Sequence, residues 1–205
     1  MSEKDGQLER DAIRAMRRSY GEVGLESLPE DPFAAFHSWL SEAAANAFIV
    51  EANAMVLSTL GTDENGADAI TTRTVLLKDV SQGGFTFFTN YVSRKGQAID
   101  LHDQVTLLFP WYAMERQVSI SGFAQKISRQ ESDDYFATRP WSSQIGAWAS
   151  AQSAPLATRE ELEQRFAGAA TKWPEGTTVP RPPQWGGYRV TPINIEFWQG
   201  RYSRL

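Results

Sequence analysis

The stretch M-V-L-S-T-L-G-T-D-E-N-G-A-D-A-I-T-T-R-T-V-L-L-K-D-V, residues 55–80, holds two runs rich in β-branched residues on either side of a polar turn. Side chains of this kind suit the pleated, half-buried surface of a strand. The G-T-D-E-N-G segment between them supplies the glycines and short polar residues that turns favour. The pattern predicts two strands, Met55–Leu60 and Ile70–Val80, joined by a short connection.

The same signature continues along the chain. It predicts strands at 84–90, 105–109 and 116–127, and a last strand pair at 188–190 and 195–199. Residues 174–187 lie before that pair and hold too much proline and glycine for regular structure. Because the strands are short and evenly spaced, with brief connections, an antiparallel barrel is favoured over a parallel sheet.

Helices are predicted before and after the main run of strands. Residues 8–20 repeat apolar side chains every four positions, and Asp31-Pro32 supplies an N-cap and a first-turn proline for a helix through residue 43. Further helices are predicted at 130–138 and from Thr158, where T-R-E-E forms a capping box, towards Trp173. No composition shift marks a second domain. We therefore expect one α+β domain over residues 1–205, with a helical segment at 1–50.

Composition narrows the chemistry. The chain has no cysteine, and His37 and His102 are its only histidines, so thiolate nucleophiles, histidine triads and histidine-rich metal sites are excluded. A net charge of -5 argues against nucleic acid as a partner. No apolar run approaches the ~20 residues of a membrane span, and the N-terminus is too polar for a signal peptide. A cytoplasmic protein without a membrane or nucleic-acid partner is expected.

Residues 139–153, R-P-W-S-S-Q-I-G-A-W-A-S-A-Q-S, concentrate hydrogen-bonding groups without a carboxylate. Arginine can bracket a phosphate, hydroxyls and amides can complete its shell, and tryptophan can cover a flat ring. The simpler interpretation is a Ser-rich connection whose tryptophans pack in the core. The chemistry favours a site for a small anionic, partly aromatic molecule.

Three further clusters combine cations with polar groups: R-T-V-L-L-K at 73–78, N-Y-V-S-R-K at 90–95 and R-Q at 116–117. Cations at strand ends are usually solvated and discourage edge pairing, which is the plainer interpretation of each cluster. In a regular strand Arg73 and Lys78 point to opposite faces, because their separation is odd. They line one pocket only if the strand bends or bulges, or if the ligand lies across its end. Otherwise each serves a different ligand.

Taken together, these motifs and their order resemble the pyridoxine/pyridoxamine 5'-phosphate oxidase family. The resemblance spans nearly the whole chain, and Q-I-G-A-W-A-S with E-F-W-Q-G is its most specific part. The matching pieces are R-R-S-Y at 17–20, R-T-V-L-L-K-D at 73–79, F-F-T-N-Y-V-S-R-K-G at 87–96, F-P-W-Y-A-M-E-R-Q-V at 109–118, Y-F-A-T-R-P-W-S-S-Q-I-G-A-W-A-S-A-Q-S at 135–153, W-G-G-Y-R at 185–189 and I-E-F-W-Q-G at 195–200.

This resemblance implies an FMN-binding split barrel that acts as a homodimer, with active sites at the subunit interface. It implies a substrate phosphate held by Tyr135, Arg139 and Ser143, and Lys78 near the substrate. Arg17 to Tyr20 would cover the site, and Arg204 would approach the pyridine ring. The FMN-binding residues implied are Arg73, Thr74, Val75, Leu76, Leu77, Lys78, Phe88, Thr89, Arg94, Lys95, Gln117, Gln152, Ser153 and Trp198.

The activity implied is hydride transfer from C4' of pyridoxamine or pyridoxine 5'-phosphate to FMN. Reoxidation by O2 then gives pyridoxal 5'-phosphate and hydrogen peroxide. No side chain is expected to act as an acid or base, since the flavin carries the chemistry. One alternative is a non-catalytic carrier of FMN or pyridoxal phosphate. Another is a split-barrel reductase using a deazaflavin, which would not require the substrate-phosphate residues.

Two positions depart from the family pattern. Residue 88 is Phe where many relatives carry Tyr, so a contact there is expected from the backbone or from packing. The family usually continues past E-F-W-Q-G to an R-L-H-D-R type ending, whereas this sequence stops at Arg204-Leu205. The histidine expected over the substrate and an arginine expected near FMN are therefore absent. A truncated sequence is expected rather than weakened catalysis.

Overall fold

The computed structural model describes residues 12–13, 15–16, 19–22, 24–25 and 27–202. The helix predicted over residues 8–20 falls mostly outside these residues, as do Arg17 and Arg204. Within the described part of the chain, no helix is long and apolar enough to cross a membrane.

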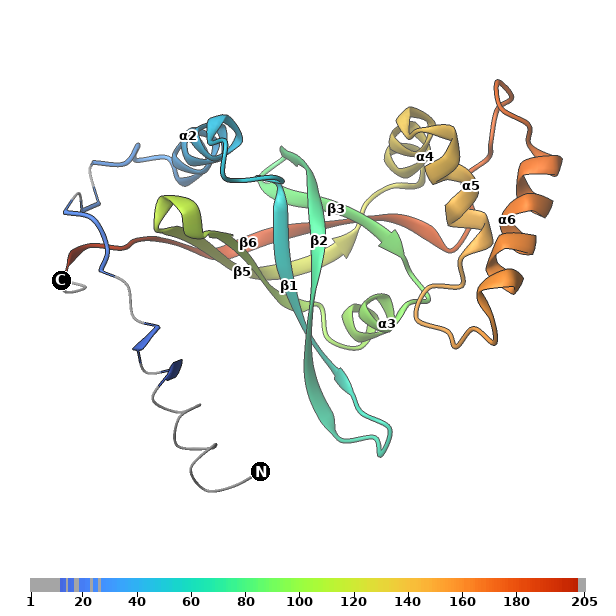
Figure 1. The fold of residues 1–205 in the computed structure, drawn as a ribbon, viewed down its shortest axis with the longest axis horizontal. Coiled ribbons are helices and arrows are strands. Elements are labelled where there is room, and N and C mark those ends of the chain that lie inside the picture. Colours follow the sequence, from blue (N-terminus) through green and yellow to red (C-terminus); the bar gives the residue numbers. More distant parts are fainter. Residues whose placement is uncertain (1–11, 14, 17–18, 23, 26, 203–205) are drawn as a thin grey trace.

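An antiparallel barrel forms the centre of the molecule (Figure 1). The strand order is β1-β2-β3-β6-β5-β4, and pairing of β1 with β4 closes the ring. The predicted α+β class and antiparallel barrel are confirmed, and the first five strands lie at nearly their predicted positions. The strands are β1 Ala54–Thr62, β2 Asp68–Ser81, β3 Gly84–Asn90, β4 Gln104–Trp111, β5 Arg116–Lys126 and β6 Trp185–Gln199.

Alternating apolar side chains fill the barrel interior. Met55 and Leu57 of β1 and Ile120 of β5 are fully buried, because every second residue of a strand points to the same face. Helix α2, Pro32–Ala45, closes the core with Phe36, whose ring lies 5.0 Å from that of Phe109. Each such buried side chain stabilises the fold by roughly 1.5–3 kcal/mol.

The start of α2 follows the predicted capping chemistry. Asp31 is the N-cap, and its carboxylate accepts hydrogen bonds from the backbone N–H groups of Phe33 and Ala34 at 3.1 and 3.2 Å. Pro32 occupies the first turn, where its missing N–H costs no hydrogen bond. The helix predicted here is confirmed.

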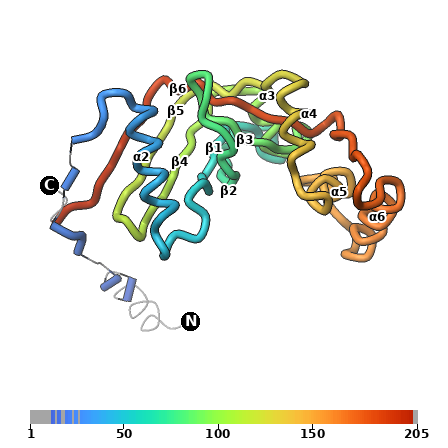
Figure 2. The backbone as a smooth tube through the Cα atoms, turned by 90° about the horizontal axis from the view of Figure 1, so that it is seen from above, coloured from blue at the N-terminus to red at the C-terminus, as the bar shows by residue number. Residues whose placement is uncertain are grey.

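A second apolar cluster lies at the far end of the barrel from α2. Helices α4, α5 and α6, Arg129–Thr138, Trp141–Ala149 and Arg159–Lys172, group there (Figure 2). Phe136, Ile145, Val179 and Trp185 are its buried residues. Trp148 packs against Trp173, with ring centroids 4.6 Å apart. The tryptophan is therefore part of the packing between these helices.

Two helices were not predicted. The N-Y-V-S-R-K cluster at 90–95 runs into a helix, α3, which Ser93 caps and which spans Arg94–Leu101. The Ser-rich stretch after Pro140 is α5. A single 3-10 turn, η1 at Tyr112–Met114, links β4 and β5. Both helices are short and carry polar faces, so neither gives a clear apolar period.

The predicted last strand pair is wrong: β6 is one strand from Trp185 to Gln199. Its register against β5 shifts between Ser121 and Gly122, where the chain passes Pro192. A bulge accommodates a proline that cannot donate to the ladder, so the strand continues through a residue that resembles a break. The W-G-G segment, predicted irregular, begins this strand. Side chains of Ile127 and Phe88 occupy the space that a Cβ at Gly187 would need.

Candidate functional site

A cavity of about 660 Å³ lies between the β2–β3 region of the barrel and helices α4 and α5. This size is typical of small-molecule sites. Its lining residues belong to segments far apart in the sequence: Thr74, Val75, Leu76, Lys78, Phe88, Thr89, Asn90, Lys95, Tyr135, Thr138, Arg139, Pro140, Ser143, Gly146, Ala147, Ser150, Gln152 and Trp185. None of these described lining residues is Asp or Glu, so the cavity carries cationic, hydroxyl, amide and aromatic groups.

Lys78 lies on the same face of β2 as Thr74 and Leu76, by the ordinary alternation of the strand, and next to a bulge. The pairing of β2 with β3 shifts register between Leu77 and Asp79. The extra residue is Lys78, which lines the cavity as Thr74 and Leu76 do. Leu77 points into the barrel core instead and is 5% exposed. Arg73 does not line the cavity, so the bulge does not bring Arg73 and Lys78 into one pocket.

The end of α4 carries the anion-binding group of one cavity wall. Arg139 is the C-cap of α4, and its guanidinium lies over the Trp185 ring, 4.6 Å from the centroid. Its Nη1 is buried and has no hydrogen-bond partner among the described residues. Burial lowers the pKa of this guanidinium, but arginine stays charged. An unpartnered buried cation beside a cavity is a binding group for an anion.

A second cation lines the cavity at the start of α3. Lys95, in the first turn of α3, donates from Nζ to Oε1 of Gln152 at 2.9 Å and to Oγ of Ser93 at 3.2 Å. Thr89 donates to the same Gln152 oxygen at 3.2 Å. Burial, and then the charge of Arg73, lower the pKa of Lys95 to about 8. Gln152 thus ties the segment after α5 to β3 and α3.

Tyr135, Phe88 and Trp185 form an aromatic stack on the cavity wall. The Phe88 and Tyr135 ring centroids are 3.8 Å apart at 15°, and Phe88 lies 5.3 Å from Trp185 at 12°. Residue 88 therefore contributes packing, as expected for Phe in place of Tyr. Burial raises the pKa of the Tyr135 phenol more than the charge of Arg139 lowers it, so the pKa lies above its ordinary value. Ser143 lines the same region from the first turn of α5.

Several predicted site residues lie outside this cavity. Arg73 donates to the carbonyl of Leu57 at 3.0 Å and to Oγ1 of Thr59 at 2.8 Å, so its side chain braces β1. Arg94 is exposed at the start of α3, and Ser153 follows Gln152 in a left-handed conformation with φ 69°.

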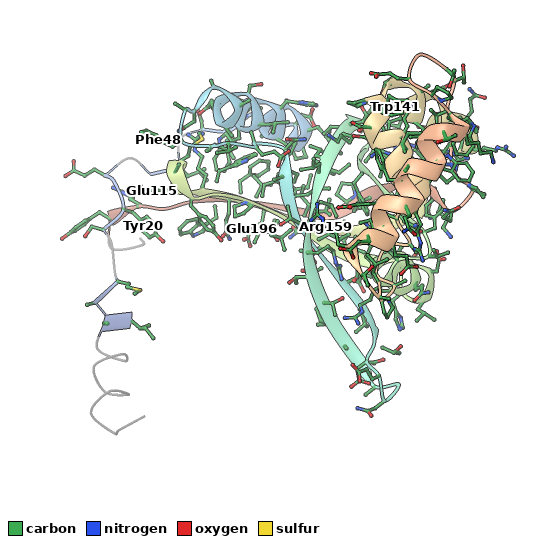
Figure 3. All side chains as sticks on the ribbon, turned by 45° about the vertical axis from the view of Figure 1, so that its right-hand side comes forward. Tyr20, Phe48, Glu115, Trp141, Arg159 and Glu196 are labelled. Carbon is green, nitrogen blue, oxygen red and sulfur yellow. The ribbon has the colours of Figure 1, made fainter. Side chains whose placement is uncertain are left out.

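Gln117 and Trp198 form a separate group at the other end of the barrel. They face each other across β5 and β6, and Tyr20 packs edge-on against Trp198 with ring centroids 5.6 Å apart. Neither residue lines the cavity. Tyr20 and Glu115 lie at the end of the molecule that carries α2, and Trp141 lies at the end that carries the cavity helices (Figure 3). One copy of the chain does not bring the two groups of predicted residues together.

Sequence reasoning missed several lining residues. Trp185 belongs to a quoted motif but received no role, and its indole turns out to support Arg139. Gly146 and Ala147 line the cavity because α5 presents one face to it, which becomes evident only once that segment is helical. The signal that could have revealed α5 was Pro140 at its start, followed by nine residues in which Gly146 is the one poor helix former.

The geometry suits a ligand that combines flat rings with anionic groups. Three cationic residues, Lys78, Lys95 and Arg139, line one cavity from three different elements, and an aromatic stack lies beside Arg139. Hydroxyls from Thr89 and Ser143 and the amide of Gln152 can complete the hydrogen bonding. Two phosphorylated ligands, or one ligand with two anionic groups, match this arrangement.

Comparison with known proteins gives consistent matches. The sequence model of the pyridoxamine 5'-phosphate oxidase family matches residues 41–173. The family model of the pyridoxine 5'-phosphate oxidase C-terminal dimerisation region matches residues 185–205. Pyridoxine/pyridoxamine 5'-phosphate oxidase of Thermobifida fusca is 49% identical over 193 residues, covering 93% of this chain and 85% of the relative. That of Burkholderia ambifaria is 50% identical over 192 residues, covering 93% and 86%.

Solved structures show the same fold. The structure of PhzG from Burkholderia lata in complex with tetrahydrophenazine-1-carboxylic acid has a TM-score of 0.77 at 30% identity, covering 86% of this chain and 84% of that chain. A pyridoxamine 5'-phosphate oxidase-related, FMN binding protein from Nostoc punctiforme has a TM-score of 0.60 at 15% identity, covering 84% and 86%. The second likeness concerns the fold alone.

Proposed function

Because the chain belongs to the pyridoxamine 5'-phosphate oxidase family, we propose that it binds FMN and oxidises pyridoxamine or pyridoxine 5'-phosphate with O2. The products are pyridoxal 5'-phosphate and hydrogen peroxide, with ammonia from the amine. The observation that carries this proposal is the buried Nη1 of Arg139, a cationic donor beside the cavity that has no hydrogen-bond partner among the described residues. A phosphorylated substrate supplies the missing acceptor.

The cavity residues suit FMN as well as substrate. Lys95 and Thr89 present donors around Gln152, and the backbone of Thr74 to Leu76 runs along the same wall. We assign this wall to FMN and the Arg139 wall to the substrate phosphate. When bound, FMN supplies the electron acceptor for the hydride from C4' and is reoxidised by O2. The protein has mainly to hold the two ring systems in reactive geometry.

On the substrate side, each residue has a separable task. Arg139 and Ser143 hold the phosphate through a cation and a hydroxyl, and Tyr135 adds a phenol. Lys78 lines the cavity from β2, and we assign to it the contact with the ring substituents. The Tyr135 phenol is protonated at neutral pH, as any tyrosine is, and can donate a hydrogen bond to the phosphate.

A homodimer would complete the site. The match of residues 185–205 to a dimerisation region supports this assembly, and so does the position of Gln117 and Trp198 away from the cavity. We propose that Gln117 and Trp198 of one copy close the FMN wall of the other. Each dimer then holds two equivalent sites, as a two-fold interface requires.

The direct test begins with the purified protein and added FMN. Flavin absorbance should be retained after gel filtration, and addition of pyridoxamine 5'-phosphate should produce one peroxide per pyridoxal 5'-phosphate. Unphosphorylated pyridoxamine is the matched control, and its kcat/KM should be far lower because Arg139 loses its partner. A protein that retains no flavin contradicts the proposal.

Two other outcomes identify different functions. Flavin binding without peroxide formation would indicate a carrier of FMN or pyridoxal phosphate. The neighbour PhzG was crystallised with tetrahydrophenazine-1-carboxylic acid, which carries a carboxylate and no phosphate. If this compound displaces a bound substrate analogue more strongly than pyridoxal 5'-phosphate does, the substrate class is an aromatic carboxylate instead.

A further inference from the structure

The Trp185 ring packs against the guanidinium of Arg139, the residue assigned to the substrate phosphate. Its ring centroid is 4.6 Å from Cζ of Arg139, and the Trp185 side chain is 7% exposed. Phe136 contacts the same guanidinium at 5.6 Å. Among the described residues Arg139 forms no ion pair with a carboxylate, so aromatic faces are what hold its charged group in place.

This kind of support leaves the cation available. A carboxylate at hydrogen-bond distance would fix Arg139 but would also neutralise it and compete with a phosphate. An indole face attracts the guanidinium through its quadrupole and uses none of its N–H donors. Nη1 of Arg139, which has no hydrogen-bond partner among the described residues, fits support by an indole face, because this donor remains available to bind an anion.

A second arginine, Arg181, holds the backbone of Trp185. Arg181, whose side chain is 9% exposed, donates from Nη1 to the carbonyl oxygens of Trp185 and Pro182. Its Nε donates to Oδ1 of Asp133 on α4 at 2.6 Å. The backbone N–H of Trp185 also donates to the Pro182 carbonyl at 3.0 Å. These contacts connect the proline-rich segment, the first residue of β6 and the helix that ends at Arg139.

We propose that Trp185, fixed by the Asp133–Arg181 pair, is a positioning residue that holds the Arg139 guanidinium in the geometry needed to bind the substrate phosphate. The inference rests on the proposed function and extends it to residues that touch neither the reacting atoms nor the phosphate. It predicts a change in substrate affinity with kcat preserved, because hydride transfer involves only the substrate and the flavin ring.

The test uses the FMN-loaded protein and the 4'-deoxy analogue of pyridoxine 5'-phosphate, in which C4' is a methyl group without a hydroxyl or amine and cannot be oxidised to the aldehyde. Its dissociation constant is measured by calorimetry for the wild type and for Trp185→Leu, Trp185→Phe and Arg139→Ala. We expect about a tenfold weakening for Trp185→Leu, and recovery to within about threefold by Trp185→Phe, which keeps an aromatic face. In turnover, KM should rise to the same extent while kcat stays within about twofold.

Substitution of Asp133 does not change a core residue, and it distinguishes a positioning effect on Arg139 from a simple change in local charge. Asp133→Asn removes a negative charge near the site, as does Asp134→Asn on the same helix, where Asp134 bonds only to Gln130 among the described contacts. Electrostatics alone predicts that both variants bind the analogue slightly more tightly. Positioning predicts that Asp133→Asn binds it several-fold more weakly, whereas Asp134→Asn does not.

The possible results distinguish the two proposals. If Arg139→Ala leaves the analogue's affinity unchanged, the phosphate assignment in the proposed function is wrong. If Arg139→Ala weakens binding but Trp185→Leu matches wild type, or if both Asp variants behave alike, the positioning role is overturned. Should Trp185→Leu fail to fold, as judged by its unfolding transition, the Trp185→Phe and Asp133→Asn measurements decide the matter.

Discussion

Lys95 and Gln152 are joined by a hydrogen bond of 2.9 Å from Nζ to Oε1, and this bond links the start of α3 to the segment that follows α5. Thr89 shares the same acceptor. A neutral amide therefore organises the cationic wall without cancelling its charge. A carboxylate at position 152 would instead neutralise Lys95.

Replacing Gln152 should weaken FMN binding in a graded way. Gln152→Ala removes the shared acceptor and should raise the FMN dissociation constant about tenfold, because a charge-assisted hydrogen bond is worth about 1.5 kcal/mol or more. Gln152→Glu should be worse, since a carboxylate neutralises Lys95 and repels the FMN phosphate. Fluorescence titration measures both, and Gln97→Ala, at an exposed position of α3, is the control. Tighter binding by Gln152→Glu would contradict the assignment of this wall to FMN.

FMN affinity should fall as the pH rises through about 8. Burial lowers the pKa of Lys95 to about 8, so above that pH the free protein loses the ammonium group. A bound phosphate favours the charged form and raises this pKa, which means that binding takes up a proton near this pH. Calorimetry in buffers of different ionisation enthalpy should detect the proton. Lys95→Met should bind FMN weakly and take up no proton; an unchanged proton uptake would locate the titration elsewhere.

Hybrid dimers should restore activity lost in two separate variants. Arg139→Ala and Gln117→Ala each damage both sites of a homodimer if the proposed interface is right. In a hybrid with one chain of each kind, one site carries both changes and the other carries neither. Differently tagged chains, co-expressed and purified through both tags, should therefore have about half the wild-type kcat/KM per dimer. If the two residues served the same copy's site, no hybrid would recover.

Acid should destabilise the protein partly through Glu131. Hydrogen bonds from Arg189 and then Ser128 lower the pKa of this carboxyl to about 2. A depressed pKa means that the contribution is present above the ordinary value of 4.5 and is lost as the pH falls from there towards 2. Glu131→Gln keeps an acceptor for the capping box at Ser128 but cannot titrate.

The measurement is the thermal unfolding midpoint from neutral pH down to about pH 3. The Glu131→Gln midpoint should be lower than that of wild type at neutral pH, and the difference should narrow in acid. Glu163→Gln, which removes the carboxylate from an exposed pair with Arg159 on α6, is the control. Parallel curves for wild type and Glu131→Gln would show that this carboxylate does not titrate during acid unfolding.

Local patterns were enough to predict the barrel but not every element around it. Asp31-Pro32 and the alternation in β1 act within a few residues, and both predictions were confirmed. Helix α5 was missed because its sequence alternates small, polar and aromatic residues whose burial depends on α4 and α6. The continuity of β6 past Pro192 depends on a bulge opposite Gly122, which involves a second strand.

The candidate site shows the same difference between features set by local sequence and features set by the packing of distant segments. Motif resemblance supplied Lys95, Arg139 and Gln152, and the structure places all three around one cavity. It could not supply Trp185, whose importance arises from a guanidinium distant in sequence, nor the separation of Gln117 from the cavity. These relations depend on how distant segments pack, and on an assembly larger than one chain.

The bulge at Lys78 has a consequence for altering this protein. Lys78 is the extra residue where the β2–β3 pairing shifts, and it is exposed, while its neighbour Leu77 stays in the core. Because the Lys78 side chain is exposed, exchanging it removes no core packing, and exposed substitutions usually change stability little. Position 78 is therefore a place where substrate preference can diverge among related enzymes, or be redesigned, at little cost in stability.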